Sequence, residues 1–287
     1  MFEYALIGIL LAVITVLPLA WKWQLGVPRI AFITVLLALL SSLLIAFLGH
    51  SLSINIVLQS ALVWLMTLIL VFAFLTYRFY RDPERAVPKR DDIIVSPADG
   101  KVIYIREAHN GMLPVSTKHG HEYRLQELTK TPFDSQEAVV IGISMNFLDV
   151  HVNRAPIAGR ITLQRHFSGL FGSLRRPEMV FENERATTVI ERDELQVAVV
   201  QIASRLVRQI VAFVREGQEV TLGQRIGVIR FGSQVDLVLP ARQDLKLAVR
   251  LGEQLRAGQS IIATFEPMGS QAIELPSQER QGVPDRM

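Results

Sequence analysis

The segment Ile54-Asn-Ile-Val-Leu-Gln-Ser-Ala-Leu-Val-Trp-Leu-Met-Thr-Leu-Ile-Leu-Val-Phe-Ala-Phe-Leu-Thr76 is apolar almost throughout and contains no charged residue. A helix crosses about 30 Å of hydrocarbon with about 20 residues, so this segment is long enough to span a membrane. Two earlier apolar runs, about Tyr4–Trp21 and Ile30–Leu48, have the same character, although the first is slightly short and contains Pro18. The sequence therefore predicts about three transmembrane helices, which form an anchor over residues 1–77.

Two other interpretations of these apolar runs are open. A cleaved signal peptide is the alternative for the first run, but Glu3 precedes that run in place of basic residues, and no A-x-A site follows it. A pair of buried core helices is the alternative for the whole region, and uncharged runs of this length disfavour it. The mean hydropathy of +0.31, with 50% apolar residues, also favours membrane spans.

The distribution of Lys and Arg predicts the orientation of the anchor. Lys22 and Arg29 lie between the first two apolar runs, and no basic residue other than His50 lies between the second and the third. Five basic residues follow the third run: Arg78, Arg81, Arg85, Lys89 and Arg90. Because Lys and Arg accumulate on the cytoplasmic side, we expect a multi-pass protein of the cell (inner) membrane with its C-terminal body in the cytoplasm.

From Asp92 onward the pattern changes to short segments that are rich in Val and Ile and separated by Gly, Asp, Asn or Pro. Such segments are typical of β-strands. The predicted strands are Lys101–Ile105, Ala138–Ile143, Thr187–Glu191, Gln196–Ile202, Val207–Val214, Arg225–Arg230 and Val235–Leu239. We therefore predict a mainly β domain over residues 78–274, followed by a polar tail over 275–287 that we expect to be disordered.

A local repeat occurs within this β region. Residues 217–226 and 252–261 share the pattern G-x-x-[VL]-x-x-G-x-x-I, which predicts a glycine-bounded turn followed by a strand. The same pattern is common in the hairpins of lipoyl- and biotinyl-like sandwich domains, so we expect a sandwich-like fold. Those domains carry a modified lysine that usually lies next to methionine. No Met-Lys pair occurs here, which disfavours a swinging-arm carrier.

The composition excludes several kinds of chemistry. The chain has no cysteine, which removes disulfides, thiolate nucleophiles and cysteine metal sites. The net charge of +3 over 287 residues gives no reason to expect a nucleic-acid partner. His119 and His121 are close in sequence but lack a carboxylate partner, so we predict no metal site.

Two segments carry polar residues that suit a reaction site. In Val95-Ser-Pro-Ala-Asp-Gly-Lys-Val102, Asp99 is either the cap of a simple turn or a functional carboxylate. In Asn146-Phe-Leu-Asp-Val-His-Val-Asn-Arg-Ala-Pro156, His151 is either a hydrogen-bonded core residue or a proton carrier. Asn153 and Arg154 follow it and are candidates for holding a carboxylate or phosphate, with a surface salt bridge as the alternative for Arg154.

The third segment is Ile229-Arg-Phe-Gly-Ser-Gln-Val-Asp-Leu-Val-Leu-Pro240, in which Gly232-Ser233 interrupts a strand-like run. A β-bulge at the glycine is one explanation. The other is a strained peptide bond beside a nucleophilic hydroxyl, because glycine permits strained backbone geometry and the serine Oγ can attack the preceding carbonyl.

Taken in order, these segments resemble one family. Phe79-Tyr-Arg-Asp-Pro-Glu-Arg85 is followed by S-P-A-D-G, V-H-V-N-R-A-P, Asn183-Glu-Arg185 and R-F-G-S, which is the order found in short-form phosphatidylserine decarboxylases. The resemblance extends from about Arg78 to about Phe265. Three spans are more than that family leads us to expect. The long form also has a second histidine where this chain has Leu148.

The resemblance implies a self-cleaving proenzyme. Asp99 would orient and charge-stabilise the imidazole of His151, which would take the proton of Ser233. Cleavage would leave a β chain that ends at Gly232 and an α chain that begins at Ser233. Ser233 would become a pyruvoyl group, which serves as the electron sink for decarboxylation without pyridoxal phosphate and without a metal.

The implied reaction converts phosphatidylserine to phosphatidylethanolamine and CO₂. The implied partners are the phospholipid bilayer and the two chains of one proenzyme, with no nucleic acid; homo-oligomerisation is left open. Two alternatives stay open from the sequence. One is a non-enzymatic, membrane-anchored β-sandwich protein of the cell envelope. The other is the same chemistry on another serine-headgroup lipid, such as an archaeal-type ether lipid.

Overall fold

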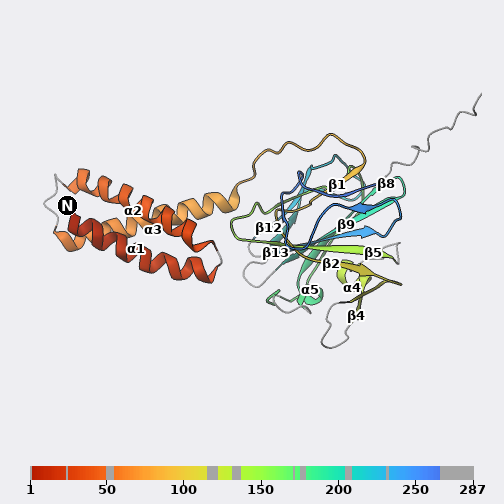
Figure 1. The fold of residues 1–287 in the computed structure, drawn as a ribbon, viewed down its shortest axis with the longest axis horizontal. Coiled ribbons are helices and arrows are strands. Elements are labelled where there is room, and N and C mark those ends of the chain that lie inside the picture. The colour runs from red at the N-terminus through yellow and green to blue at the C-terminus, as the bar shows by residue number, and fades with distance from the viewer. Residues whose placement is uncertain are drawn as a thin grey trace, which may run out of the picture.

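The computed structural model describes residues 2–23, 25–49, 55–114, 122–130, 137–170, 172–174, 179–203, 209–230 and 233–265. Within these ranges an N-terminal bundle of three long helices leads into a mainly antiparallel β domain (Figure 1). The predicted fold class is therefore confirmed. The predicted tail over 275–287 lies outside the described residues.

The bundle consists of α1 (Phe2–Lys22), α2 (Val27–Gly49) and α3 (Ile56–Tyr80). Each helix is long and apolar enough to cross a membrane, so the protein is membrane-associated. The first run forms one helix with Pro18 inside it. The side chain of Asn55 caps the start of α3 by accepting a hydrogen bond from the Leu58 backbone nitrogen at 2.9 Å.

The largest sheet of the β domain has eight antiparallel strands in the order β11-β7-β8-β9-β13-β5-β2-β15. Their alternating apolar residues pack into one core on each face of the sheet. The strands are β2 (Gly100–Ala108), β5 (Ala138–Met145), β7 (Gly159–Phe167), β8 (Arg185–Arg192), β9 (Leu195–Ala203), β11 (Glu219–Val220), β13 (Ser233–Pro240) and β15 (Gln254–Leu255). The sheet places β13 at its centre, hydrogen bonded to β9 on one side and to β5 on the other.

Smaller sheets complete the domain. One has the order β1-β16-β14, a second has the order β10-β12-β6, and β3 pairs with β4. Their strands, with two short helices, are β1 (Ile93–Val95), β3 (Met112–Pro114), β4 (Glu122–Arg124), β6 (Val152–Arg154), β10 (Gln209–Ala212), β12 (Arg225–Arg230), β14 (Lys246–Leu247), β16 (Ile261–Thr264), α4 (Leu125–Thr129) and α5 (Met179–Glu182). Every segment that the sequence predicts as a strand coincides or overlaps with one.

The sequence repeat is also a structural repeat. Gly217 and Gly252 have φ angles of +83° and +86°, and Gly223 and Gly258 both have φ of +72°. These left-handed conformations favour glycine, which explains the spacing of the pattern. Each repeat contributes one short strand to the large sheet and one longer strand to a small sheet.

The repeat at 252–261 packs against the S-P-A-D-G segment, and the repeat at 217–226 packs against the V-H-V-N-R-A-P segment. Each repeat and its segment form a half-unit of the domain. The first half-unit comprises residues 92–102 and 252–265, and the second comprises residues 151–161 and 217–230. Two backbone hydrogen bonds of 2.9 Å cross between them, one from Val95 N to Pro156 O and one from Arg154 N to Pro97 O. This reciprocal pair brings the S-P-A-D-G and V-H-V-N-R-A-P segments together.

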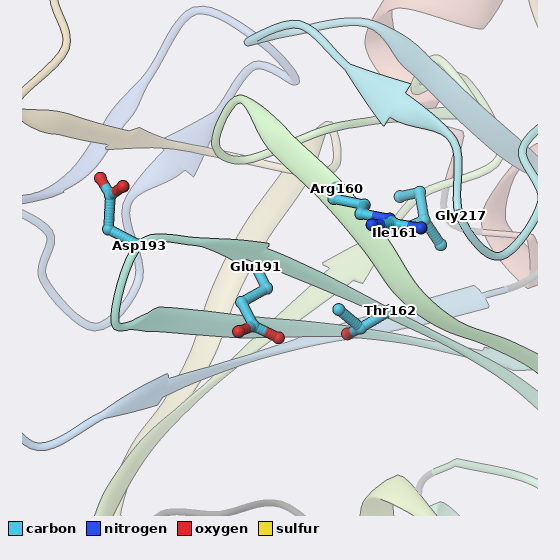
Figure 2. Close-up of a pocket in the computed structure, with 6 residues that line it drawn as sticks. All are labelled: Arg160, Ile161, Thr162, Glu191, Asp193 and Gly217. Atoms are coloured by element: carbon cyan, nitrogen blue, oxygen red, sulfur yellow. The ribbon is translucent and has the colours of Figure 1, made fainter.

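A surface hollow of about 460 Å³ lies beside β7 and β8 (Figure 2). Its lining residues are Arg160, Ile161, Thr162, Glu191, Asp193 and Gly217. None of the predicted site residues lines this hollow.

Candidate active site

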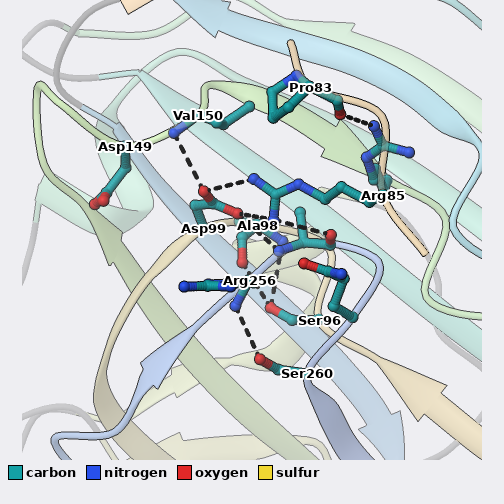
Figure 3. A network of polar contacts seen from close by, with 12 residues as sticks. Pro83, Arg85, Ser96, Ala98, Asp99, Asp149, Val150, Arg256 and Ser260 are labelled. Carbon is teal, nitrogen blue, oxygen red and sulfur yellow. Dashed lines mark hydrogen bonds and ion pairs between the residues drawn. The ribbon is translucent and has the colours of Figure 1, made fainter. Parts of the chain in front are cut away.

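Asp99 lies in the turn between β1 and β2, and its carboxylate is buried and held by three donor groups. Arg85 forms a two-pronged ion pair with it, with Nη1–Oδ1 at 2.7 Å and Nη2–Oδ2 at 2.8 Å (Figure 3). The Ala257 backbone nitrogen donates to Oδ1 at 2.8 Å, and the Val150 nitrogen donates to Oδ2 at 3.4 Å. These contacts fix the carboxylate between the linker (residues 81–91, after α3), the first half-unit and the segment before His151.

His151 is buried at the end of the segment that joins β5 to β6. Its Nδ1 lies 2.9 Å from the carbonyl oxygen of Asp149, and its ring centroid lies 4.4 Å from that of Phe79. Because only a protonated Nδ1 can donate to a carbonyl oxygen, this contact places the lone pair of the neutral ring on Nε2. Nε2 is buried and has no hydrogen-bond partner among the described residues.

The surroundings keep His151 neutral. Burial lowers the pKa of the imidazole to about 4, against smaller raising effects of the Asp149 carbonyl and the Asp99 charge. At neutral pH the ring is therefore an uncharged base with a free nitrogen. This is the protonation state that a general base requires.

Asp99 does not hydrogen bond to His151. The imidazole takes its orientation from the carbonyl of Asp149, and Asp99 contacts the adjacent backbone through Val150. The structure thus brings the two residues into one cluster, with Asp99 acting on His151 through the backbone and through its charge. The expected part of Asp99 in cleavage stays a prediction.

Gly232 and the side chain of Ser233 lie outside the described residues, whereas the backbone of Ser233 is described. Ser233 is the first residue of β13, and its backbone pairs with Met145 in β5 and Ala203 in β9. The preceding strand, β12, is tied to His151, because the Ile229 nitrogen donates to the His151 carbonyl oxygen at 3.2 Å. Ile229 comes four positions before Ser233 in the sequence. That Ser233 and His151 act together stays a prediction.

Asn153 and Arg154 are buried within the protein. Asn153 Oδ1 accepts a hydrogen bond from Gln201 at 2.8 Å. Arg154 is 4% exposed and donates to the carbonyl oxygens of Gly223 at 3.0 Å and Pro83 at 3.1 Å. These contacts tie Asn153 to β9 and tie Arg154 to the residues that follow α3. Their expected contact with substrate stays a prediction.

Comparison with known proteins assigns the family. The model of the family described as phosphatidylserine decarboxylase matches residues 72–263. The chain belongs to the phosphatidylserine decarboxylase family. A relative from Methanothermobacter thermautotrophicus strain Delta H is 37% identical over 201 residues, which cover 69% of this chain and 85% of that protein.

A second relative, from Methanocaldococcus jannaschii, is 42% identical over 188 residues, which cover 66% of this chain and 88% of that protein. Both relatives are named archaetidylserine decarboxylase proenzymes. Membership of the phosphatidylserine decarboxylase family confirms that the chain is an enzyme, a decarboxylase, and sets the non-enzymatic alternative aside. The family match begins inside α3, so α1 and α2 precede the matched region.

The end of the helical bundle contacts this candidate site directly. Phe79 lies in the last turn of α3, is 3% exposed, and packs against both His151 and Phe147, the latter at a centroid distance of 5.1 Å. Trp23, just after α1, stacks on Phe147 at 6.3 Å. The segment that carries His151 therefore lies against the membrane-spanning helices, on the side where α1 and α3 end.

Sequence reasoning missed two contacts of this site: the packing of Phe79 on His151 and the ion pair of Arg85 with Asp99. Phe79 is an apolar residue at the end of a span, which by pattern alone is a lipid-facing residue. Arg85 lies in a basic cluster that is typical of a solvated surface. Their position in the family motif Phe79-Tyr-Arg-Asp-Pro-Glu-Arg85 was the only available signal for either role.

The other histidines do not form a metal centre within the described ranges. No group of three or more His, Asp or Glu side chains there is arranged to hold a metal ion. His166 Nε2 lies 3.0 Å from Glu184, and His109 Nδ1 lies 2.7 Å from Glu137. His119 and His121 lie outside the described residues.

Proposed function

We propose that this decarboxylase is a pyruvoyl enzyme made as a proenzyme, which cleaves itself between Gly232 and Ser233 and then decarboxylates a serine-headgroup phospholipid. The product from phosphatidylserine is phosphatidylethanolamine. The observation that carries the proposal is the buried Nε2 of His151, which has no hydrogen-bond partner among the described residues. It belongs to a neutral base whose backbone is hydrogen bonded to Ile229, four positions before Ser233 in the sequence.

The proposed cleavage begins at Ser233. Its Oγ bonds to the carbonyl carbon of Gly232 while His151 Nε2 accepts the hydroxyl proton, and the peptide C–N bond breaks as the nitrogen gains a proton. The resulting ester breaks when Ser233 loses its Hα and the oxygen leaves Cβ with Gly232 as a carboxylate. Water then replaces the α-nitrogen, which departs as ammonia, and a pyruvoyl group is left at the new N-terminus.

The described residues fit such a group. Ser233 opens a strand that is hydrogen bonded on both sides, so the new N-terminus stays in place after cleavage. The α chain also contributes β15, which pairs with β2, and β16, which pairs with β1. These pairings support a mature enzyme in which the two chains remain together without a covalent link.

The pyruvoyl group supplies a carbonyl that attracts the electrons released from the substrate as CO₂ leaves. His151 handles the proton that must then reach the substrate carbon, since it can take up a proton at Nε2 and return it. Phe79 and the surrounding core exclude water from this nitrogen. The base that serves cleavage therefore also suits the decarboxylation step.

The membrane anchor suits a lipid substrate. The acyl chains of the substrate stay in the bilayer, so the reacting headgroup must meet the site at the membrane surface. The contacts of Phe79 with His151 and of Trp23 with Phe147 support this placement. The basic residues after α3 favour the cytoplasmic side of the inner membrane.

A second substrate is favoured by the comparisons. Both named relatives are archaetidylserine decarboxylase proenzymes, so an ether-linked serine lipid is the alternative to phosphatidylserine. The two lipids share the serine headgroup and differ in the linkage and nature of their chains, which lie farther from the reacting carbon. The same cleavage and the same site residues serve both.

Release of CO₂ tests the proposal. Purified enzyme in detergent is given phosphatidylserine, an ether-linked serine lipid or free serine, with Ser233→Ala as the control. We expect CO₂ from at least one of the two lipids, little from free serine and none from the control. A Ser233→Ala variant as active as the native enzyme would refute the pyruvoyl mechanism.

A further inference from the structure

Two arginines mark the end of the last membrane-spanning helix. Arg78 lies in the last turn of α3, and Arg81 is the residue that ends the helix. Tyr77 and Tyr80 alternate with them and are 72% and 59% exposed. Tyrosines are typical of the boundary between hydrocarbon and headgroups, so the guanidinium groups lie at headgroup level.

The same helix end faces the candidate active site. Phe79, between the two arginines, packs on the ring of His151 at a centroid distance of 4.4 Å. Burial raises the pKa of the Asp149 carboxyl, while Arg81 and Arg78 are close enough to oppose that rise. The charge of Asp99 likewise acts on Arg81. The charge of Asp149 therefore interacts with both arginines, and that of Asp99 with Arg81.

Neither arginine has an anionic partner in the part of the chain that the structure describes. Among the described residues, no carboxylate lies within 4.0 Å of either guanidinium. Arg81 makes one long hydrogen bond of 3.5 Å, from Nη1 to the carbonyl oxygen of Arg78. Burial and the neighbouring Arg78 charge lower the pKa of Arg81. Two partly buried positive charges thus lie together, with no carboxylate in contact among the described residues.

Other arginines around the linker differ from this pair. Arg85 is paired with Asp99, and Arg225 is paired with both Asp82 and Glu84. Asp99, Asp82 and Glu84 are thus committed to other arginines, whereas Arg78 and Arg81 have no ion pair among the described residues. An uncommitted pair at headgroup level beside a reaction site fits an anionic ligand.

We propose that Arg81, assisted by Arg78, binds the phosphodiester of the lipid substrate. The inference rests on the proposed function, and it adds the residues that hold the substrate. The planar donor fork of arginine matches two phosphate oxygens. A phosphate held there leaves the acyl chains beside α3 in the bilayer and directs the serine end toward His151.

The arrangement also divides the two negative charges of the headgroup. The phosphate is bound by the arginines, whereas the carboxylate that is lost must reach the apolar surroundings of His151 and Phe79, where water is scarce. A carboxylate gains little there before CO₂ leaves. The phosphate contact must therefore supply much of the affinity, which places the effect of these arginines in KM more than in kcat.

The test compares processed Arg81→Gln and Arg81→Lys enzymes with native enzyme in mixed micelles of serine-headgroup lipid and neutral detergent. We expect the KM for surface lipid to rise about tenfold or more in Arg81→Gln, the loss of one charged hydrogen-bonded contact, with partial recovery in Arg81→Lys. The matched control is Lys22→Gln/Arg29→Gln, which removes two positive charges at the same end of the bundle, and its KM should change less than twofold. An equal rise in the control, or no rise in Arg81→Gln, would overturn the proposal.

Direct binding separates this inference from the proposed reaction. The uncut Ser233→Ala chain and its Arg81→Gln derivative are titrated with short-chain phosphatidylethanolamine, with inorganic phosphate and glycerophosphoserine as competitors. We expect binding to weaken about tenfold in the derivative, and competition by either soluble anion to weaken with it. Equal binding and competition in both chains would refute the arginine site even if decarboxylation is observed. A native enzyme without decarboxylase activity would refute the proposed function and leave this binding result standing.

Discussion

The two half-units of the β domain have the same local structure and different polar residues. In each half-unit a glycine with the same φ angle donates a backbone hydrogen bond to the motif segment. Gly258 N donates to Ser96 O at 2.8 Å, and Gly223 N donates to Ala155 O at 2.9 Å. When Ser96 is matched with Ala155, the position of Asp99 in the first half-unit is occupied by Ala158 in the second. The repeated backbone therefore supplies the scaffold, and one copy alone carries the buried carboxylate.

The half-units also differ at the residue that precedes β6 in one and β1 in the other. His151 precedes β6, and the matching residue before β1 is Asp92. The carbonyl oxygens of both accept a hydrogen bond from the facing strand or its end, from Ile229 N at 3.2 Å and from Phe265 N at 2.9 Å. Each half-unit thus contributes one member of the predicted catalytic set at a position where the other has an unrelated residue. Functional asymmetry in this domain comes from side chains and not from backbone geometry.

The largest effect, on the rate of self-cleavage, is expected from replacing Asp99. Asp99→Asn keeps the shape but removes the charge that Arg85 neutralises and that acts on His151, so self-cleavage should slow about a hundredfold or more. Ala158→Asn places the same side chain at the matching position of the second half-unit, and this variant should cleave at the native rate. A gel time course of newly made protein measures both. Cleavage of Asp99→Asn at the native rate would remove Asp99 from the process.

Substitution of the glycines next to Asp99 and Ala158 should distinguish an effect on the stability of the domain from an effect on the rate of cleavage. Gly100 and Gly159 have φ of +145° and +154°, and an added Cβ would lie 2.4 Å from Ser144 O and 2.3 Å from Glu191 O. Alanine at either position should destabilise the β domain by about 3 kcal/mol or more. Thermal unfolding in detergent should show a similar loss for both variants. Cleavage at a temperature where both remain folded should slow in Gly100→Ala only, because that residue adjoins Asp99.

The titration of His151 should give the second half-unit a pH dependence of stability. The pKa of His151 is about 4 in the folded protein, below the ordinary value of 6.5, so the unfolded chain binds the proton more readily between these values. The stabilisation is fully present above pH 6.5 and is lost as the pH falls toward 4, by up to about 3 kcal/mol. Unfolding midpoints of uncut Ser233→Ala protein between pH 7.5 and 4.5 should show this loss. A His151→Asn change in the same background should flatten it, and an unchanged slope would place the titrating group elsewhere.

The smallest effect is expected at the position that matches His151. Asp92 forms an exposed ion pair with Arg90, and such pairs contribute little. Asp92→Asn should therefore leave the unfolding midpoint and the cleavage rate within experimental error of the native protein. A clear loss of cleavage in this variant would mean that the two half-units are functionally less different than their side chains indicate.

Much of this architecture could be predicted because it depends on local patterns. Charge-free runs such as Ile54–Thr76 specify spans, and the G-x-x-[VL]-x-x-G-x-x-I repeat specifies turns that only glycine adopts readily. Contacts between distant segments could not be predicted in the same way. Nothing local in the basic cluster indicates that Arg85 reaches Asp99, or that the Asp149 carbonyl, not Asp99, orients His151. The packing of Phe79 on His151 depends equally on how the bundle meets the β domain.

The mass of the purified protein in detergent tests the central claim most directly. Self-cleavage predicts two chains that divide between Gly232 and Ser233, with the smaller chain blocked to Edman degradation because a pyruvoyl group has no free amine. Both chains should elute together until they are denatured, since β13 is paired on both sides. A single chain of 32.2 kDa that stays uncut over time would contradict the account and would leave Asp99, His151 and Ser233 as structural residues.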